Sequence, residues 1–132
     1  MNKNFVTTFI TLPGQADEAM ALYVRTFPDA EILQVTRYES SEYGVEGKVM
    51  NGQLRINDSL LYFMDFKDDQ APMASWRLSL YIDIASEKDF DQIFEGLAHE
   101  GVVLMGPEAI MGLQKVAWIT DVFGITWQLV FA

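Results

Sequence analysis

The sequence predicts an α+β fold in which two βαβββ modules form a curved mixed sheet with the helices on its outer face. Strand-like and helix-like segments occur in the same order twice along the 132 residues. The two helical segments also align with each other at a constant offset of 74 residues. We therefore expect a single domain over residues 1–132, with a first module at 4–66 and a second at 76–132.

In the first module, the residues 5–12 are rich in β-branched and aromatic side chains, which favours a strand. Residues 15–27 carry apolar side chains at helical spacing, with acidic residues in the first turn and Pro28 directly after them. Three strand-like runs follow at residues 31–38, 48–56 and 59–66. Asn57-Asp58 predicts a two-residue hairpin turn between the last two.

The second module repeats this order. Residues 78–84 predict a strand, and residues 86–100 a helix that begins at Ser86 and ends at Gly101. Strands are then expected at 102–105, 114–120 and 125–131. The aligned helix positions are Ala16, Ala19, Met20 and Tyr23 in the first module, and Phe90, Ile93, Phe94 and Leu97 in the second.

Several strands are apolar on both faces, most clearly residues 60–64, and also 116–119 and 127–131. One face of each strand must cover a helix. The other face then lines a small-molecule pocket or a dimer contact, or it is buried in a thicker core.

Composition excludes several functions. The chain has no cysteine, so disulfides, thiolate metal sites and a cysteine nucleophile are absent. Its formal net charge of −10 disfavours binding to nucleic acid or to an anionic membrane surface. Residues 1–4 begin no signal peptide and no apolar run is long enough to span a membrane, so a cytoplasmic protein is expected.

The segment from Val116 to Val130, VAWITDVFGITWQLV, resembles the vicinal-oxygen-chelate superfamily. More narrowly it is similar to the PhnB-like branch, often labelled 3-demethylubiquinone-9 3-methyltransferase-like. This resemblance covers nearly the whole chain. It is supported by further residues: the stretch GQADEAM at 14–20 with Tyr23, the pair Glu46-Gly47, and Ser79. It implies the paired βαβββ fold and a homodimer.

Enzymes of this superfamily usually hold a divalent metal with His and Glu side chains from four strands. The resemblance places the corresponding positions at Thr8, at Tyr62 or its same-face neighbour Met64, at Arg77 or Ser79, and at Gln128. None is a histidine or a carboxylate, and one neutral amide cannot hold a transition metal. We therefore expect no metal and no other cofactor.

Other candidates have structural explanations. His99, the one histidine, stands at the end of the second helix, and the acids from Asp83 to Glu95 cap or solvate that helix. Asp121 is expected to shape the turn before Gly124, and Trp118 and Trp127 could face each other across it as core residues. No glycine-rich turn of the kind used by ordinary S-adenosylmethionine enzymes is present.

The hypothesis favoured by these observations is a metal-free protein that binds a small molecule in the concave face of the sheet. Its pocket candidates are Thr8, Tyr62, Ser79 and Gln128, with Arg77 as an optional anion anchor. Whether a reaction follows is left open. The alternatives are a divalent-metal lyase or isomerase, and a non-catalytic dimeric interaction module.

Overall fold

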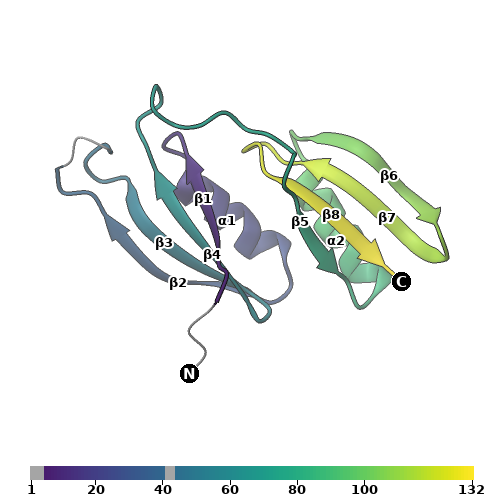
Figure 1. Ribbon diagram of the computed structural model, residues 1–132. Helices are drawn as coiled ribbons and strands as arrows, with labels where there is room; N and C mark the ends of the chain where they lie inside the picture. Colours follow the sequence, from purple (N-terminus) through teal and green to yellow (C-terminus); the bar gives the residue numbers. More distant parts are fainter. Residues whose placement is uncertain (1–4, 41–43) are drawn as a thin grey trace. The chain divides into compact units, whose positions relative to one another are not determined.

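A computed structural model describes residues 5–40 and 44–132 and confirms the α+β fold with its repeated βαβββ order (Figure 1). Residues 1–4, which include the expected start of the first module, lie outside this description. The elements are β1 (Thr8–Leu12), α1 (Ala16–Thr26), β2 (Ala30–Arg37), β3 (Val49–Ile56), β4 (Ser59–Asp65), β5 (Leu80–Asp83), α2 (Glu87–Ala98), β6 (Val102–Ile110), β7 (Leu113–Thr120) and β8 (Thr126–Phe131).

The chain divides into two compact units. The first holds the chain up to Val24 together with Asp29–Pro72, and the second holds Arg25–Pro28 together with Met73–Ala132. The unit boundary therefore falls inside α1, whose last residues pack with the second unit. Neither described helix is long and apolar enough to cross a membrane.

The first unit contains a four-stranded sheet in the order β1-β4-β3-β2. β1 runs parallel to β4, and the other neighbouring strands are antiparallel. The predicted turn at Asn57-Asp58 joins β3 to β4, since Ile56 pairs with Ser59, and Asn57 adopts a positive φ of 49°. Asparagine tolerates this conformation better than most residues, which explains its place in a two-residue turn.

Helix α1 covers one face of this sheet with the apolar residues that its spacing predicted. Met20 and Tyr23 are fully buried, and the Tyr23 ring lies 6.1 Å from the ring of Phe63 on β4. The helix begins at a buried carboxylate that the sequence analysis did not single out. Asp65 accepts hydrogen bonds from the backbone N–H groups of Ala16 at 2.9 Å and Val49 at 3.2 Å. Burial raises the pKa of the Asp65 carboxyl, and these two hydrogen bonds partly oppose that rise.

The second unit repeats the arrangement with the order β5-β8-β7-β6, where β5 is parallel to β8. Helix α2 begins at Ser86, whose hydroxyl accepts a hydrogen bond from the backbone N–H of Asp89 at 3.1 Å, as the near capping box predicted. The helix buries Phe90, Ile93 and Leu97 against β7 and β8. Alternation along β7 and β8 places Ala117, Ile119 and Leu129 on this helix side.

The polar face of α2 is solvated, as expected. Lys115 on β7 forms ion pairs with Asp91 at 2.7 Å and Glu87 at 3.1 Å, and its Nζ lies 5.7 Å from the Phe90 ring centre. His99 is exposed at the end of the helix, with its Nε2 3.4 Å from a carboxylate oxygen of Glu100. The acidic side chains of the helix therefore form ion pairs or face solvent, and among the described residues they do not form a metal site.

Several predicted boundaries differ from the structure. β1 begins at Thr8 and not at residue 5, β5 begins at Leu80 and not at residue 78, and α2 ends at Ala98 and not at residue 100. β6 was expected to end at Met105 but continues to Ile110, and a second two-residue turn at Met111-Gly112 joins it to β7. Gly106-Pro107, a pair that ordinarily marks a turn, is instead a pairing irregularity within the strand, because the register shifts between Met105 and Glu108. After α2, the left-handed position is taken by Glu100, with φ of 58°, and not by the neighbouring glycine.

Candidate functional site

The candidate site lies on the face of the second sheet that α2 leaves uncovered. Trp118 on β7 pairs with Gln128 on β8, and Gln128 pairs with Tyr81 on β5, so these three side chains point to the same face. Ser79, one residue before β5, joins them through a hydrogen bond to Gln128, and Trp76 joins them through a ring contact with Trp118. We call these five residues the Gln128 cluster.

A buried aspartate fixes the two strands that carry the centre of the cluster. Oδ1 of Asp121 accepts hydrogen bonds from the backbone N–H groups of Phe123 at 2.9 Å and Ile125 at 3.1 Å. Its Oδ2 accepts one from the indole Nε1 of Trp127 at 3.0 Å. The expected turn-shaping role of Asp121 is therefore confirmed, and the same carboxylate also ties the turn to the core.

The two tryptophans of this hairpin do not face each other, which corrects the interpretation made from the sequence. Trp127 pairs with Ile119 on the helix side and is 3% exposed, and its ring lies 5.1 Å from that of Phe27. Trp118 stands on the opposite face, beside Gln128. Neighbouring residues of a strand point to opposite faces. Trp127 and Gln128 are neighbours on β8, so Trp127 lies in the core, and Trp118, which pairs with Gln128, lies on the face of the cluster.

The cluster contains polar groups that protein partners only partly satisfy. Nε2 of Gln128 donates a hydrogen bond to Oγ of Ser79 at 2.9 Å, and no described residue donates to the Oε1 of Gln128. Nε1 of Trp118 is buried and has no hydrogen-bond acceptor among the described residues. One acceptor and one donor on cross-strand neighbours are therefore left to bind something else.

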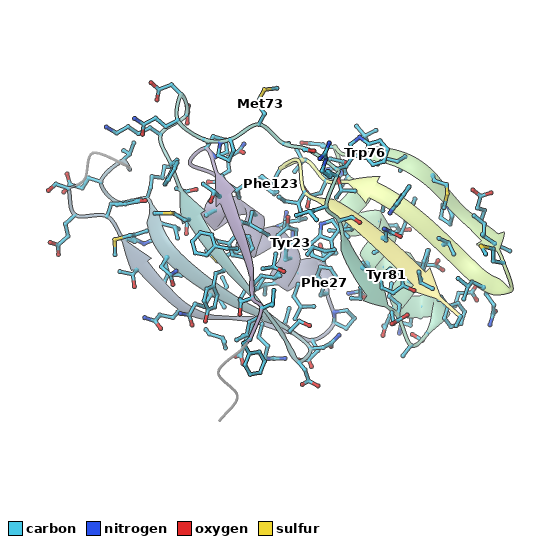
Figure 2. The ribbon with its side chains drawn as sticks, in the orientation of Figure 1. Tyr23, Phe27, Met73, Trp76, Tyr81 and Phe123 are labelled. Atoms are coloured by element: carbon cyan, nitrogen blue, oxygen red, sulfur yellow. The ribbon has the colours of Figure 1, made fainter. Side chains whose placement is uncertain are left out.

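Aromatic rings border these polar groups. The Trp76 and Trp118 ring centres are 5.8 Å apart with an angle of 70° between planes, an edge-to-face contact. Trp76 is 57% exposed and Tyr81 58% exposed, and both are carried by the second unit (Figure 2). Aromatic side chains together with a few polar groups are the residue types that line most small-molecule sites.

The other predicted site residues are not part of this cluster. Tyr62 on β4 lies on the uncovered face of the first sheet, and its ring is 6.4 Å from the ring of Phe9. Thr8 pairs with the buried Leu61, so the register places it on the helix side of that sheet, away from the face of Tyr62. Arg77 is exposed in the segment before β5 and bonds through its backbone N–H to Ser75.

The residues present do not fit a divalent metal. Thr8, Tyr62, Ser79 and Gln128 offer hydroxyl, phenol and amide groups, and the described residues contain no group of three or more His, Cys, Asp or Glu side chains able to hold an ion. Transition metals in proteins require imidazole, thiolate or carboxylate ligands in sufficient number. The described residues at these positions therefore supply no ligand set for a divalent metal.

Comparison with known proteins identifies the family. Residues 4–130 match the family described as 3-demethylubiquinone-9 3-methyltransferase. The chain belongs to this family. The PhnB protein of Bacillus cereus is 31% identical, with 96% of this chain and 98% of that one covered and a TM-score of 0.87. The resemblance to the PhnB-like branch of the vicinal-oxygen-chelate superfamily is thereby confirmed.

More distant structures of this family's fold are also similar. Protein PA1353 from Pseudomonas aeruginosa is 18% identical over 96% of this chain and 98% of that one, with a TM-score of 0.80. The fosfomycin resistance protein FosX from Mesorhizobium loti is 13% identical over 100% of this chain and 94% of that one, with a TM-score of 0.65. At these identities the likeness shows the fold alone. No curated protein matches the chain.

Sequence reasoning named Ser79 and Gln128 but missed three members of the cluster. The sequence predicts Tyr81 only as part of a strand and Trp118 as a core residue. Neither could be placed beside Gln128 from alternation alone, because the register between β8 and its neighbouring strands is not set by the sequence. Trp76 lies in an irregular segment before β5, where no periodicity gives a signal.

Proposed function

We propose that this protein binds a small organic molecule on the uncovered face of its second sheet, without the help of a metal. The observation that supports this is the Gln128 cluster, which combines an unsatisfied indole N–H, an amide bonded on one side to Ser79, and exposed aromatic rings. A buried indole N–H without an acceptor costs about 1–3 kcal/mol, and a ligand oxygen would remove that cost only where the rings move to expose it. Whether a reaction follows binding is not part of the proposal.

The metal-dependent alternative has no support from these residues. A structural neighbour, FosX from Listeria monocytogenes, is described as complexed with Mn(II) and a sulfate ion, but it is only 12% identical to this chain. Metal binding depends on the side chains at the site, so a shared fold does not transfer it from that protein to this chain. A lyase or isomerase of that type would need carboxylates or imidazoles at positions that hold neutral groups here.

The family description names a methyl transfer, and we do not extend it to this chain. Each sheet has a single parallel pair of strands, β1 with β4 and β5 with β8. The common S-adenosylmethionine site is built on a doubly wound parallel sheet with a glycine-rich first turn. The two βαβββ modules provide neither feature, so the family name is a label for relatedness and not for a mechanism.

The proposal is tested by thermal unfolding of the purified protein, first with chelator and then with nickel, zinc, manganese or iron. We expect no metal to change the melting temperature. A library of neutral aromatic fragments is then screened in the same assay. A ligand at about a hundred times its dissociation constant adds roughly 2.7 kcal/mol, which raises the melting temperature by several degrees.

Two variants locate the binding. Gln128→Ala should reduce the shift caused by any fragment that binds. Gln114→Ala is the matched control, because Gln114 is also on the second sheet but its amide donates to the backbone carbonyl of Ala132 at 3.0 Å, outside the cluster. A specific stabilisation by one metal, or fragments whose effect is the same in both variants, would contradict the proposal. The predicted homodimer is tested separately, by the sedimentation of the ligand-free protein.

A further inference from the structure

Residues 73–78, which lead into β5, form an irregular segment that lies against the rest of the second unit at two points. Trp76 meets Trp118 through the edge-to-face ring contact described above. Ala74 lies at the turn between β7 and β8, where a Cβ added to Gly124 would come 2.7 Å from the Cβ of Ala74. The segment therefore reaches from this turn to Trp118 and brings the Trp76 ring against the indole.

Few interactions hold this segment in place. Its backbone N–H of Arg77 donates to Oγ of Ser75 at 3.2 Å, which is a bond within the segment, and none of its backbone groups bonds to a strand of the described chain. Met73 and Leu78 are 93% and 85% exposed, and Figure 2 shows Met73 pointing away from the sheet. Segments with exposed side chains and no ladder hydrogen bonds are those that open at low free-energy cost.

The indole that Trp76 contacts is poorly satisfied in this arrangement. Nε1 of Trp118 is buried and finds no acceptor among the described residues. Met105 and Gln128 pair with Trp118 from the neighbouring strands, and Trp76 adds a ring contact from outside those strands. A buried donor without a partner is unfavourable, and contact with water would satisfy it. Moving Trp76 away therefore loses a ring contact but gains a hydrogen bond, which brings the two arrangements closer in free energy.

We propose that residues 73–78 form a cover that opens and closes over Trp118 while the rest of the second unit stays folded. In the closed arrangement Trp76 shields the indole, and in the open one the indole N–H donates to water. Ser79 is the fixed end of the cover, because its hydroxyl accepts from Gln128 at 2.9 Å and β5 begins at the next residue. The motion itself requires no ligand, whereas its use as a gate to the uncovered face rests on the proposed function.

Hydrogen exchange of the three tryptophan indole N–H groups measures this motion in the purified, ligand-free protein. Each is followed by 15N-resolved NMR, and the single variants Trp76→Ala and Trp118→Phe assign the signals. We expect the Trp118 proton to exchange more slowly than that of Trp76, which is 57% exposed. Its rate should stay nearly constant as urea is raised within the folded range, because a local opening exposes little new surface. A rate that rises with urea as steeply as global unfolding would overturn the proposal.

The variant Trp76→Ala removes the ring that shields the indole. We expect it to speed exchange at Trp118 about tenfold, which is the strength of an aromatic pair expressed as an equilibrium constant. Trp127 is the internal control, because its indole donates to Asp121 at 3.0 Å and should keep its exchange rate, which also shows that the hairpin is intact. Leu78→Ala is the matched control variant. It changes an exposed side chain of the same segment and should leave the Trp118 rate unaltered.

The outcomes separate the cover from the proposed binding. An equal Trp118 rate in Trp76→Ala and in the unaltered protein would overturn the cover. A Trp118 proton that exchanges as fast as that of Trp76 would also overturn it, because the indole would then be unshielded. The same holds if Leu78→Ala speeds exchange as much as Trp76→Ala, since that would show general loosening of the segment. Failure of the whole fragment library, by contrast, would remove the proposed function and leave the cover in place.

Discussion

The carboxylate of Asp121 offers the sharpest test of how the second module holds its hairpin. Asp121→Asn keeps one oxygen to accept from the backbone N–H groups of Phe123 and Ile125. It replaces Oδ2, which lies 3.0 Å from Nε1 of Trp127, with an N–H₂ group. Two donors then face each other where a charged hydrogen bond stood. Hydrogen bonds to charged groups contribute about 1.5–3 kcal/mol, and the buried donor adds a desolvation cost, so we expect a loss of about 2–3 kcal/mol.

This loss converts into a measurable change in melting temperature. An unfolding entropy of about 2.1 cal/mol/K per residue gives roughly 0.28 kcal/mol/K for this chain, or about 3.6 °C for each kcal/mol. The variant should therefore melt about 7–11 °C below the unaltered protein. Urea denaturation should give the same free-energy loss with an unchanged m-value, since the change is local.

A double-mutant cycle with Trp127→Phe separates the donor conflict from general damage. Phenylalanine removes the indole N–H, so adding Asp121→Asn to that background no longer opposes two donors. We expect the double variant to be more stable than the sum of the single losses implies, by about 1–2 kcal/mol. Additive losses within about 0.5 kcal/mol would refute the reasoning, because they would show that the carboxylate and the indole are not coupled.

Three further predictions concern other parts of the fold. Gly96→Ala should destabilise by about 1–3 kcal/mol in a denaturant titration, because a Cβ there would lie 2.5 Å from the side chain of Thr26. Glu100→Gly should stabilise by about 0.5–1 kcal/mol by the same measurement, because Glu100 adopts a left-handed φ of 58°. Asp17 accepts two hydrogen bonds from Arg37, which hold the pKa of its carboxyl below the usual value. The resulting stabilisation is therefore present above the unfolded-state pKa of about 3.9, and it is lost as pH falls through the lower pKa of the folded state. A carboxyl NMR titration should show the lowered pKa of Asp17, and Arg37→Ala should return that pKa toward its usual value.

The order of helices and strands could be predicted because, in each module, the local sequence signals agree with the structure that forms. Helical spacing predicted the buried faces of both helices, and Asn57 and Ser86 marked a turn and a helix start that the structure confirms. The end of β6 and the residue that takes the left-handed position after α2 differ from the prediction for tertiary reasons. Gly106-Pro107 looked like a break, but β6 resumes pairing with β7 beyond it, and a non-glycine residue, Glu100, takes the left-handed position after α2.

The candidate site was less predictable because it depends on pairing between distant strands. Gln128 and Ser79 were named through a resemblance, but their hydrogen bond joins residues 49 positions apart. Asp65 was missed for the same reason, since its partners Ala16 and Val49 come from other elements. Thr8 and Tyr62 were expected to point into one pocket, whereas the parallel register places them on opposite faces and pairs Phe9 with Tyr62. A one-residue difference in register moves a side chain to the opposite face, and the sequence alone does not set it.

The two modules share a topology but present different chemistry on their uncovered faces. In the first, the parallel pair β1–β4 places Phe9 against Tyr62, an edge-to-face aromatic contact. In the second, the equivalent pair β5–β8 places Tyr81 beside Gln128, with Ser79 completing a hydrogen bond. The two modules therefore share a topology, while one uncovered face carries an aromatic contact and the other a hydrogen bond between side chains. Neither uncovered face supplies a charged group at these positions, so if the proposed binding occurs, neutral hydrogen bonds and ring contacts would carry it, which the Gln128→Ala comparison tests.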